Sequence, residues 1–393
     1  MPRTFRQKRP GFVTLMAVVA AVFLFIIGVG LLTLGFNRRL YSIRSNHQLA
    51  ARAAADYGLT EAVYEMNRRL PAGITSPLTK SNTAINGTNV DGSSATYSYT
   101  VTVNNPHSVT AHGTSGSITK TVSCELRRKS IFEYAILTKN TLNIWPCSTV
   151  NCLNCGDIPL QIGTTSNQKD TIILKSGSTI DGDILYGEGG ITSEVVNNQN
   201  ATVTGDVYAV ATDFDLPTPT VPAYFSSAPN KGAISASGSL STPGNYIYTK
   251  IDLKNGGTLN INANVELYIT GDIILKNGAD INIAPNVKVA IYLAGAFDGY
   301  YGAGFNDHGD PRNLTIYGLA ANSIIIKNSD AFCGTIYAPN ADVTIDAKAK
   351  VYGSIIANTY IQKNSAIFTY DGRLRQITDA NLYYYVPTHW REL

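Results

Sequence analysis

The side chains of this 393-residue chain that could do chemistry are chiefly aspartates beyond residue 180. A polysaccharide lyase would need calcium-binding carboxylates with a lone basic group on one face, and a glycosidase would need two carboxylates at a defined separation. Neither set can be assembled from these positions. Most of the aspartates adjoin Gly or Asn, where a short acceptor side chain caps a turn, so we expect turn-forming roles and no enzymatic activity. The residues are Asp181, Asp183, Asp206, Asp272, Asp280, Asp342 and Asp346.

The insertion "DGYYGAGFNDHGDPRN", residues 298–313, groups further oxygen ligands. Asp307 and Asp310 stand three positions apart, a spacing at which oxygen ligands can hold calcium, and Asp298 opens the insertion. No glutamate follows at a spacing that would let it bind the ion through both carboxylate oxygens, and the ligand spacing of an EF-hand loop is missing. We therefore expect no metal and no cofactor, with these three aspartates as the candidates to check. The five histidines lie in separate segments without a G-x-S-x-G motif, so we expect no nucleophilic triad.

Five cysteines are the remaining reactive side chains. Three of them form a C-x4-C-x2-C pattern in "PCSTVNCLNCG". A zinc site would need a fourth ligand, whereas export across a membrane favours oxidation, so a disulfide-pinned loop is favoured over a metal site. The odd number leaves at least one thiol free or paired between subunits, and the pairing stays open. The disulfide candidates are Cys124, Cys147, Cys152, Cys155 and Cys333.

A repeated sequence motif surrounds many of these residues and would set their positions in the fold. The stretch "DIILKNGADINI" at residues 272–283 is typical of it. An alternating apolar run ends at a Lys-Asn-Gly cassette, and comparable positions recur about every 20 residues, a period typical of solenoids. Period-2 alternation predicts strands, and Asn and Gly supply the left-handed backbone angles of tight corners. The five cassettes are Lys175-Ser176-Gly177, Lys254-Asn255-Gly256, Lys276-Asn277-Gly278, Lys327-Asn328-Ser329 and Lys363-Asn364-Ser365.

The repeat predicts a single-stranded parallel β-helix over residues 131–374. Each coil would stack on the next at about 4.8 Å, giving roughly eight to ten coils. Tyrosine is frequent, with 23 residues, and we expect most of these rings to face neighbours within the fold. Isoleucines would form stacked ladders along one core, at Ile273, Ile283, Ile324, Ile326, Ile345 and Ile355.

Residues 12–70 predict one long helix with two different halves. Its first part, residues 12–36, is uninterrupted and apolar; it would span about 37 Å as a helix and can cross a bilayer. A basic leader, residues 1–11, precedes it, and no signal-peptidase site of the A-x-A type follows, so we expect the helix to stay attached. The second part is amphipathic until Pro71, with Leu49, Ala53 and Tyr57 among the residues of the packing face.

Residues 71–130 predict a linker followed by a small antiparallel meander. The linker runs to residue 93, and the strands are "ATYSYTVTV", "HSVTAHG" and "GSITKTVSCELRR". Residues 375–393 contain three consecutive tyrosines and Trp390, and we expect this aromatic tail to cap an end of the solenoid. The fold class is therefore mainly β, with a long N-terminal helix.

The N-terminal 70 residues resemble a type IV prepilin. The basic leader ends at Gly11, the apolar helix begins at Phe12, and "AARAAADYGLTEAVYEMN" is similar to the corresponding stretch of PilX-type minor pilins. The resemblance implies cleavage after Gly11 by prepilin peptidase and methylation of Phe12. Major pilins carry a glutamate five residues into the mature chain, and here Met16 stands in its place. Subunits without that glutamate resemble initiators or tip subunits.

The repeat, with "GTIYAPNADVTI" and the closing Trp390-Arg391-Glu392, resembles an uncharacterised repeat domain found behind PilX-type helices. Together the resemblances imply a structural, minor pilin-like subunit of a type IV pilus or a type II secretion pseudopilus, initiating or tip-located and adhesive. Three alternatives stay open: an ordinary single-pass anchor, a membrane-anchored surface β-helix that binds or cleaves polysaccharide, and a polymerising scaffold of the bactofilin kind.

The distribution of charge argues against a nucleic-acid partner. The formal net charge is +3, but four basic residues fall within the leader, and no basic patch is interleaved with aromatic residues. The expected partners are prepilin peptidase, other pilin or pseudopilin subunits through the N-terminal helix, the inner membrane before assembly, and a glycan or substratum ligand. The expected location is the inner membrane, with the C-terminal domain outside the cytoplasm, and then the pilus or cell surface.

Overall fold

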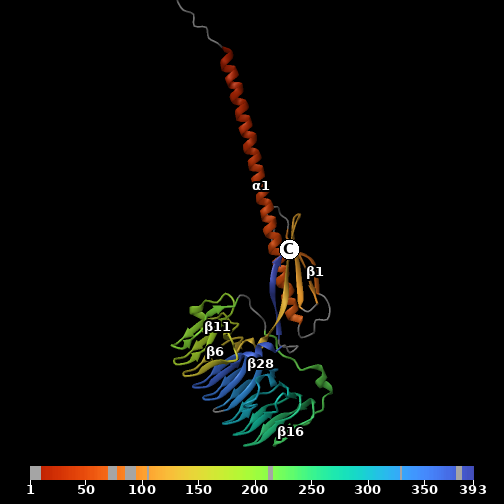
Figure 1. The fold of residues 1–393 in the computed structure, drawn as a ribbon, viewed down its shortest axis with the longest axis vertical. Coiled ribbons are helices and arrows are strands. Elements are labelled where there is room, and N and C mark those ends of the chain that lie inside the picture. Colours follow the sequence, from red (N-terminus) through yellow and green to blue (C-terminus); the bar gives the residue numbers. More distant parts are fainter. Residues whose placement is uncertain are drawn as a thin grey trace, which may run out of the picture. The chain divides into compact units, whose positions relative to one another are not determined.

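The computed structural model describes residues 10–69, 78–84, 94–103, 106–210, 216–327, 330–377 and 383–393, with the side chains of residues 10–13, 69, 82 and 84 left out. The chain forms two compact units, Met1–Arg128 with Tyr384–Leu393, and Lys129–Tyr383. The predicted fold class is confirmed: a long N-terminal helix and a small antiparallel sheet precede a parallel β-solenoid of about 9 turns (Figure 1).

The first unit is built on the helix α1, Pro10–Arg69, which continues for 60 residues because no helix breaker occurs before Pro71. Its second half packs against a five-stranded sheet of order β1-β2-β3-β4-β31. The strands are β1 Leu78–Ala84, β2 Thr96–Thr102, β3 His107–Ser115, β4 Ile118–Ser130 and β31 Tyr383–Glu392.

The face of α1 that packs is the expected one only in part. Leu59, Ala62 and Met66 are buried as expected, but Leu49, Ala53 and Tyr57 are exposed, and small side chains of the preceding turns are buried in their place. A Cβ atom at Gly113 of β3 would lie 2.0 Å from the carbonyl oxygen of Ala51, so only glycine allows so close an approach of helix and strand. The small buried residues are Ala51, Ala54, Ala55 and Ala62.

Two predictions about the segments around the meander are wrong. The linker contains a strand, β1, whose polar sequence "LTKSNTA" gave little alternation signal. The C-terminal tail is the fifth strand of the small sheet, not a solenoid cap: the backbone N–H of Leu393 donates to the oxygen of Thr121 at 3.0 Å. A strand edge offers unpaired backbone groups to any extended segment, so aromatic content did not decide the tail's partner.

The second unit is the solenoid. The strands of its first part are β5 Ile136–Thr138, β6 Leu142–Ile144, β7 Thr149–Leu153, β8 Leu160–Thr164, β9 Ile172–Leu174, β10 Thr179–Ile180, β11 Gly182–Tyr186, β12 Val196–Asn198, β13 Thr202–Val203 and β14 Val207–Ala209. Those of its second part are β15 Ala233–Ile234, β16 Gly238–Leu240, β17 Gly244–Tyr248, β18 Lys250–Leu253, β19 Thr258–Ile261, β20 Val265–Ile269, β21 Ile273–Leu275, β22 Asp280–Ile283, β23 Val289–Leu293, β24 Phe297–Gly299, β25 Gly304–Phe305, β26 Leu314–Gly318, β27 Ser323–Ile326, β28 Ala331–Ile345, β29 Lys350–Gln362 and β30 Ile367–Asp371. Short helices lie at η2 Ile131–Glu133, α2 Thr192–Val195, η3 Ala223–Ser227, η4 Pro311–Asn313 and η5 Gly372–Gln376.

The coils do not stack in the order of the sequence, contrary to the expectation that each coil follows the previous one. The chain enters at the middle: β5 lies between β8 and β29, with Ile136 paired to both Ile162 and Ile355. The first part winds outward to β14, and the second part begins at the other end and winds back until β29 and β30 close on β5, β6 and β7 (Figure 1). The first coil is therefore interior, with a hydrogen-bonded neighbour on each side.

A ladder of apolar residues runs through the core of both parts. Along one face the paired positions read Leu267, Ile291, Ile316, Ile336, Ile355, Ile136, Ile162, Ile184 and Val207. Of the isoleucines predicted to point inward, Ile283 alone is half-buried, because its partner strand β25 ends at Phe305 and no rung covers it. The other five are buried, which confirms the alternation at Ile273, Ile324, Ile326, Ile345 and Ile355.

The cassette corners take the expected backbone conformation. Gly177, Gly256, Gly278 and Ser365 have φ of 74°, 69°, 66° and 59°, in the left-handed region that Gly adopts without strain. Asn328 and Ser329 of the fourth cassette lie outside the described residues. The Asn-Gly step therefore serves the corner, and the carbonyl oxygen of the preceding lysine accepts the hydrogen bond that closes it, a role that does not require the lysine side chain.

The segment that connects the two parts of the solenoid, described from residue 216 to residue 228, covers a row of tyrosines on the outside of the solenoid. The hydroxyl of Tyr337 donates to the oxygen of Pro217 at 2.7 Å, and the ring of Phe225 meets those of Tyr268 and Tyr292 at 5.9 and 5.5 Å. Tyr292 also stacks on Tyr317 of the next strand at 4.8 Å. These rings therefore face neighbours within the fold, as expected, and are not a free sugar-stacking surface.

Candidate functional site

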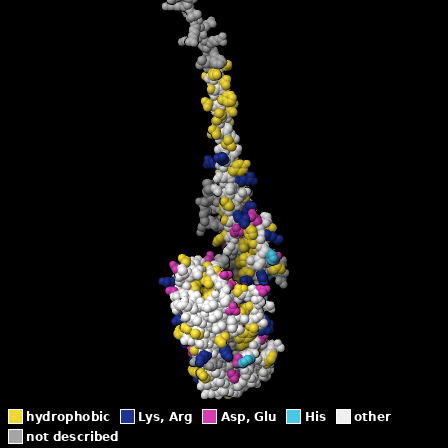
Figure 2. Space-filling model, turned by 60° about the vertical axis from the view of Figure 1, so that its left-hand side comes forward, with side chains coloured by type: hydrophobic (Ala, Val, Ile, Leu, Met, Phe, Trp, Pro, Cys, Tyr) yellow, Lys and Arg dark blue, Asp and Glu magenta, His cyan; other side chains and the backbone are white. Residues whose placement is uncertain are grey.

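The first candidate surface is the N-terminal half of α1. The side chains from Leu15 to Phe36 are largely exposed although most are apolar, and Figure 2 shows them covering this part of the helix. By length and composition it is the one helix of the described residues that could cross a membrane. Arg38 and Arg39 follow the apolar stretch directly, where basic side chains would lie at a membrane edge. An apolar helix surface of this kind is stable only against lipid or other apolar helices.

The predicted processing site adjoins this surface. Leader residues 1–9 lie outside the described residues, and of Gly11 and Phe12 only the helical backbone is described. Met16 is 61% exposed on the helix, so no carboxylate stands at the position where major pilins have one. The cleavage and methylation of these residues stay predictions.

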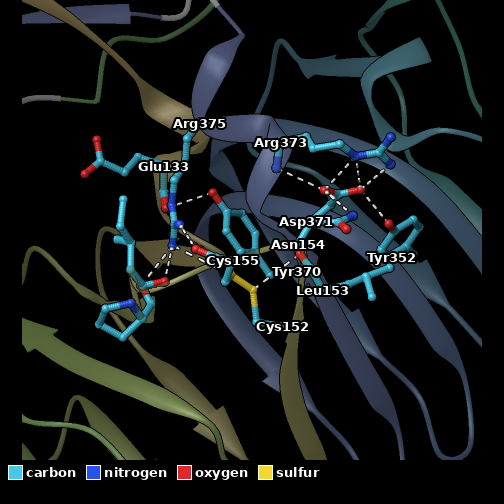
Figure 3. Close-up of a disulfide and its surroundings, with 12 residues drawn as sticks. Glu133, Cys152, Leu153, Asn154, Cys155, Tyr352, Tyr370, Asp371, Arg373 and Arg375 are labelled. Carbon is cyan, nitrogen blue, oxygen red and sulfur yellow. Dashed lines mark hydrogen bonds and ion pairs between the residues drawn. A yellow bond between two sulfur atoms is a disulfide. The ribbon is translucent and has the colours of Figure 1, made fainter.

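The cysteines form one disulfide, between Cys152 and Cys155, whose Cα atoms are 6.0 Å apart (Figure 3). The other three are not paired. Cys124 and Cys333 are buried, and burial raises their thiol pKa values to about 11 and about 12, which keeps both protonated and unreactive. Cys147 is exposed as a free thiol. The disulfide closes the loop after β7, and the guanidinium of Arg375 donates to the oxygens of Cys155 and Pro159 at 3.1 and 2.9 Å.

A charged cluster at Asp371 lies beside this loop (Figure 3). The carboxylate is fully buried, and it accepts hydrogen bonds from the Arg373 guanidinium at 3.0 Å, from the Arg373 backbone N–H at 2.9 Å, from the Asn154 amide at 3.2 Å and from the Tyr352 hydroxyl. Burial by itself raises the pKa of Asp371, but these donors outweigh burial and hold it at about 2. The cluster ties the last coil to the first.

The metal candidates of the insertion do not converge. Asp298 pairs with Lys327 at 2.7 Å, and Asp307 lies 3.0 Å from the ring of His308. Asp310 pairs with the guanidiniums of Arg312 and Arg373, and the hydrogen bond from Arg312 lowers its pKa. Among the residues that the structure describes, no group of three or more His, Cys, Asp or Glu side chains could hold a metal ion.

Of the aspartates expected to cap their own turns, Asp346 does so, whereas Asp183 and Asp272 accept from the neighbouring coil instead. Asp183 and Asp272 accept from the backbone N–H groups of Asp206 and Ala296 at 2.9 and 2.8 Å. Asp346 accepts from the next backbone N–H, that of Ala347, at 2.9 Å. Backbone hydrogen bonds therefore engage all three of these carboxylates.

Asp330 is a buried carboxylate that the sequence did not single out. It accepts from the backbone N–H groups of Ala303 and Lys327, both at 2.9 Å, and so holds the insertion to its corner. Its exposed fraction is 2%, and burial raises its pKa to about 7. Neither the residues next to Asp330 nor its spacing from other aspartates predicts that it is buried. Its burial depends on the insertion folding back over it.

We expect the stability of the solenoid to fall as the pH rises from about 4 to about 7. Asp330 in the folded chain keeps its proton in this range while the unfolded chain has lost it, so raising the pH favours unfolding, by about 4 kcal/mol. Thermal unfolding followed across this range is the measurement. Asp330→Asn should flatten the dependence, and Asp307→Asn, on an exposed side chain of the same insertion, should leave it unchanged. An equal slope in wild type and Asp330→Asn would contradict the assignment.

A surface hollow of about 620 Å³ lies over β17, β20, β23, η4 and η5. Its basic side chains are already engaged: Arg312 and Arg373 pair with Asp310, and the Lys288 amine donates to the oxygen of Arg312 at 2.7 Å. Charges that are satisfied within the fold leave this hollow without an evident chemical role.

Comparison with known proteins finds similarity over part of the solenoid. Residues 215–377 match a domain of unknown function (DUF7305). No curated protein matches. The competence-associated pilin ComZ of Thermus thermophilus is a similar solved structure, at 12% identity and a TM-score of 0.26, with 88% of this chain and 97% of that one covered. An ice-binding protein of Antarctomyces psychrotrophicus has 11% identity and a TM-score of 0.25, with coverage of 61% and 95%, and the Arctic yeast protein LeIBP has 14% and 0.24, with coverage of 62% and 91%. Likenesses at this level assign no function to the chain.

Proposed function

We propose that this chain is a structural, non-enzymatic, minor pilin-like subunit whose α1 helix anchors it in a membrane and then packs into a filament. The observation that carries the proposal is the division of α1 into two halves. The first exposes apolar side chains throughout, and the second is covered by its own sheet, so that one continuous helix joins an apolar stem to a folded head.

The division matches two successive environments. A helix that is apolar all round is stable in lipid, and within a filament the same surface can be buried against the stems of other copies. In this proposal prepilin peptidase removes the leader, residues 1–11, and the partners of the mature stem are other pilin or pseudopilin subunits. The subunit is first held in the inner membrane by this stem, with the small sheet and the solenoid outside the cytoplasm, and is then exposed on a pilus or pseudopilus.

We further propose that the subunit lies at or near the tip of the filament. Met16 cannot accept the charge-neutralising contact that a glutamate would offer to the amino terminus of a neighbouring subunit. A solenoid of about 9 turns on every subunit would also crowd a helical array. A terminal position removes both difficulties and leaves the solenoid free to contact a surface.

Replacing the last leader residue tests the proposal. We expect the wild-type chain, expressed with a prepilin peptidase, to lose residues 1–11 and to begin with a methylated Phe12, whereas Gly11→Val should stay uncut because the bulkier side chain would occupy the cleavage position. Gly28→Val is the matched control: it lies in the same apolar stretch with no atom within 4 Å of the added Cβ, and we expect normal cutting. Intact mass and N-terminal sequencing give the readout. An intact leader in the wild type, or a cut beyond Phe36, would refute the pilin-like role.

A further inference from the structure

The five cassette lysines, far apart in sequence, lie in a single row on the solenoid. Each follows directly on a strand whose last residues pair across neighbouring coils, as in Leu253 with Leu275 and Ile345 with Gln362. The position after each strand is therefore stacked as well. In order along the axis, this lysine row is Lys254, Lys276, Tyr300, Lys327, Asp346, Lys363, Trp145, Lys175 and Gln199.

Aromatic rings within the row hold lysine amines on their faces. The amine of Lys276 lies 4.7 Å from the ring centre of Tyr300 on one side, and that of Lys327 lies 3.8 Å from it on the other. Lys175 lies 4.8 Å from the ring centre of Trp145. Cation–π contacts of this kind keep the amines in place, so the row is preorganised.

The charges along the row are sparse and regular. From Lys276 onward a lysine occupies every second position, and Tyr300, Asp346 and Trp145 fill the positions between, so successive amines of the set are two strand spacings apart, roughly 9.6 Å. Lys327 and Lys363 retain side-chain exposures of 30% and 37% and can still meet a ligand while pairing with Asp298 and Asp346.

The composition of the row selects among polyanions. Duplex DNA presents one charge per ~1.7 Å of its axis, a density that single amines roughly 9.6 Å apart cannot neutralise. An extended polysaccharide with one carboxylate per disaccharide has a repeat close to two strand spacings. Its sugar rings also offer apolar faces to Trp145.

We infer that the lysine row binds an extended acidic polysaccharide carrying one carboxylate per disaccharide, with its axis along the solenoid. Each lysine of the alternating set meets one carboxylate, and the ring of Trp145 contacts an intervening sugar. Corner geometry requires only the Asn-Gly part of the cassette, so it does not account for the lysine side chain that precedes it. The inference does not depend on filament assembly, because every residue of the row belongs to the solenoid unit.

The test measures binding of the full-length chain, in detergent, to a decasaccharide of alternating uronate and N-acetylated sugars, against a neutral chitin-type oligosaccharide and a 30-base-pair DNA duplex. Trp390→Phe leaves Trp145 as the single tryptophan, so its emission reports contact at the row itself. We expect the acidic oligosaccharide to bind most tightly. Lys276→Gln with Lys327→Gln should weaken it about fivefold at low salt, as two partly exposed charge contacts would.

The matched control is Lys169→Gln with Lys350→Gln, which removes the same charge from two exposed lysines outside the row. We expect it to bind like the wild type. The inference is overturned if the row variant and this control bind alike, if the neutral oligosaccharide binds as tightly as the acidic one, or if DNA binds more tightly with the same sensitivity to the row variant. Failure here would leave the pilin-like role standing, since that role is tested by cleavage of the leader.

Discussion

A chain carrying Ile355→Asp is expected to lose the folded solenoid. The side chain is fully buried in the apolar ladder, between Ile336 and Ile136 on the two neighbouring strands. A carboxylate there has no partner, and burying it costs several kcal/mol, comparable with the 5–15 kcal/mol by which whole domains are stable. The position also joins the last coil to the first, so both parts of the solenoid lose a stacked neighbour at once.

Far-ultraviolet circular dichroism and limited proteolysis of the full-length chain provide the measurement. We expect loss of β signal and rapid cleavage within residues 129–383. The matched control is Ile361→Asp on the same strand, whose side chain points outward and is half-buried, and we expect it to cost about 1 kcal/mol or less. A folded Ile355→Asp chain with the thermal midpoint of the wild type would show that this ladder is not the core.

Asp371→Ala is expected to lower the free energy of unfolding of the solenoid by about 2 to 3 kcal/mol, the usual cost of leaving buried donors without a charged acceptor, because Arg373 is 39% exposed and keeps Asp310 as a partner. The substitution leaves the guanidinium of Arg373 and the donors of Tyr352 and Asn154 without their shared acceptor. The stabilisation has a definite pH range. Because the folded pKa is depressed to about 2, it is present above the ordinary aspartate pKa and is lost as the pH falls toward 2.

Denaturant unfolding of three variants separates this cluster from general charge effects. Asp307→Ala, on a side chain 45% exposed, is the control and should change stability by less than about 0.5 kcal/mol. Asp371→Ala combined with Arg373→Ala should cost less than the sum of the two single changes, because the double variant leaves neither charge unpaired. Strict additivity would mean that the two side chains do not stabilise the fold through each other.

Local sequence determined the elements of this protein. The helix α1 needs only an unbroken run of helix-compatible residues up to Pro71, and each strand needs only a few alternating residues. The left-handed corners at Gly177, Gly256 and Gly278 follow from the residue type itself. For the same reason the inward isoleucines could be predicted one strand at a time, and only Ile283, whose burial depends on a partner strand, differed.

Tertiary structure alone decided how those elements are arranged. Ile, Val, Leu and Phe side chains can replace one another as rungs of the ladder, so no local pattern predicts that Ile136 stacks on Ile355. The observed order is stable because each rung needs only an apolar neighbour. The C-terminal tail pairs with the edge of β4, and this pairing was also not predictable, because backbone groups form hydrogen bonds whatever their side chains are. The alignment of five distant lysines in one row, and the burial of Asp371 among donors from separate coils, likewise arise from register between segments far apart in sequence. Pairing of that kind is set by the summed packing of the whole ladder, which a short stretch of sequence does not encode.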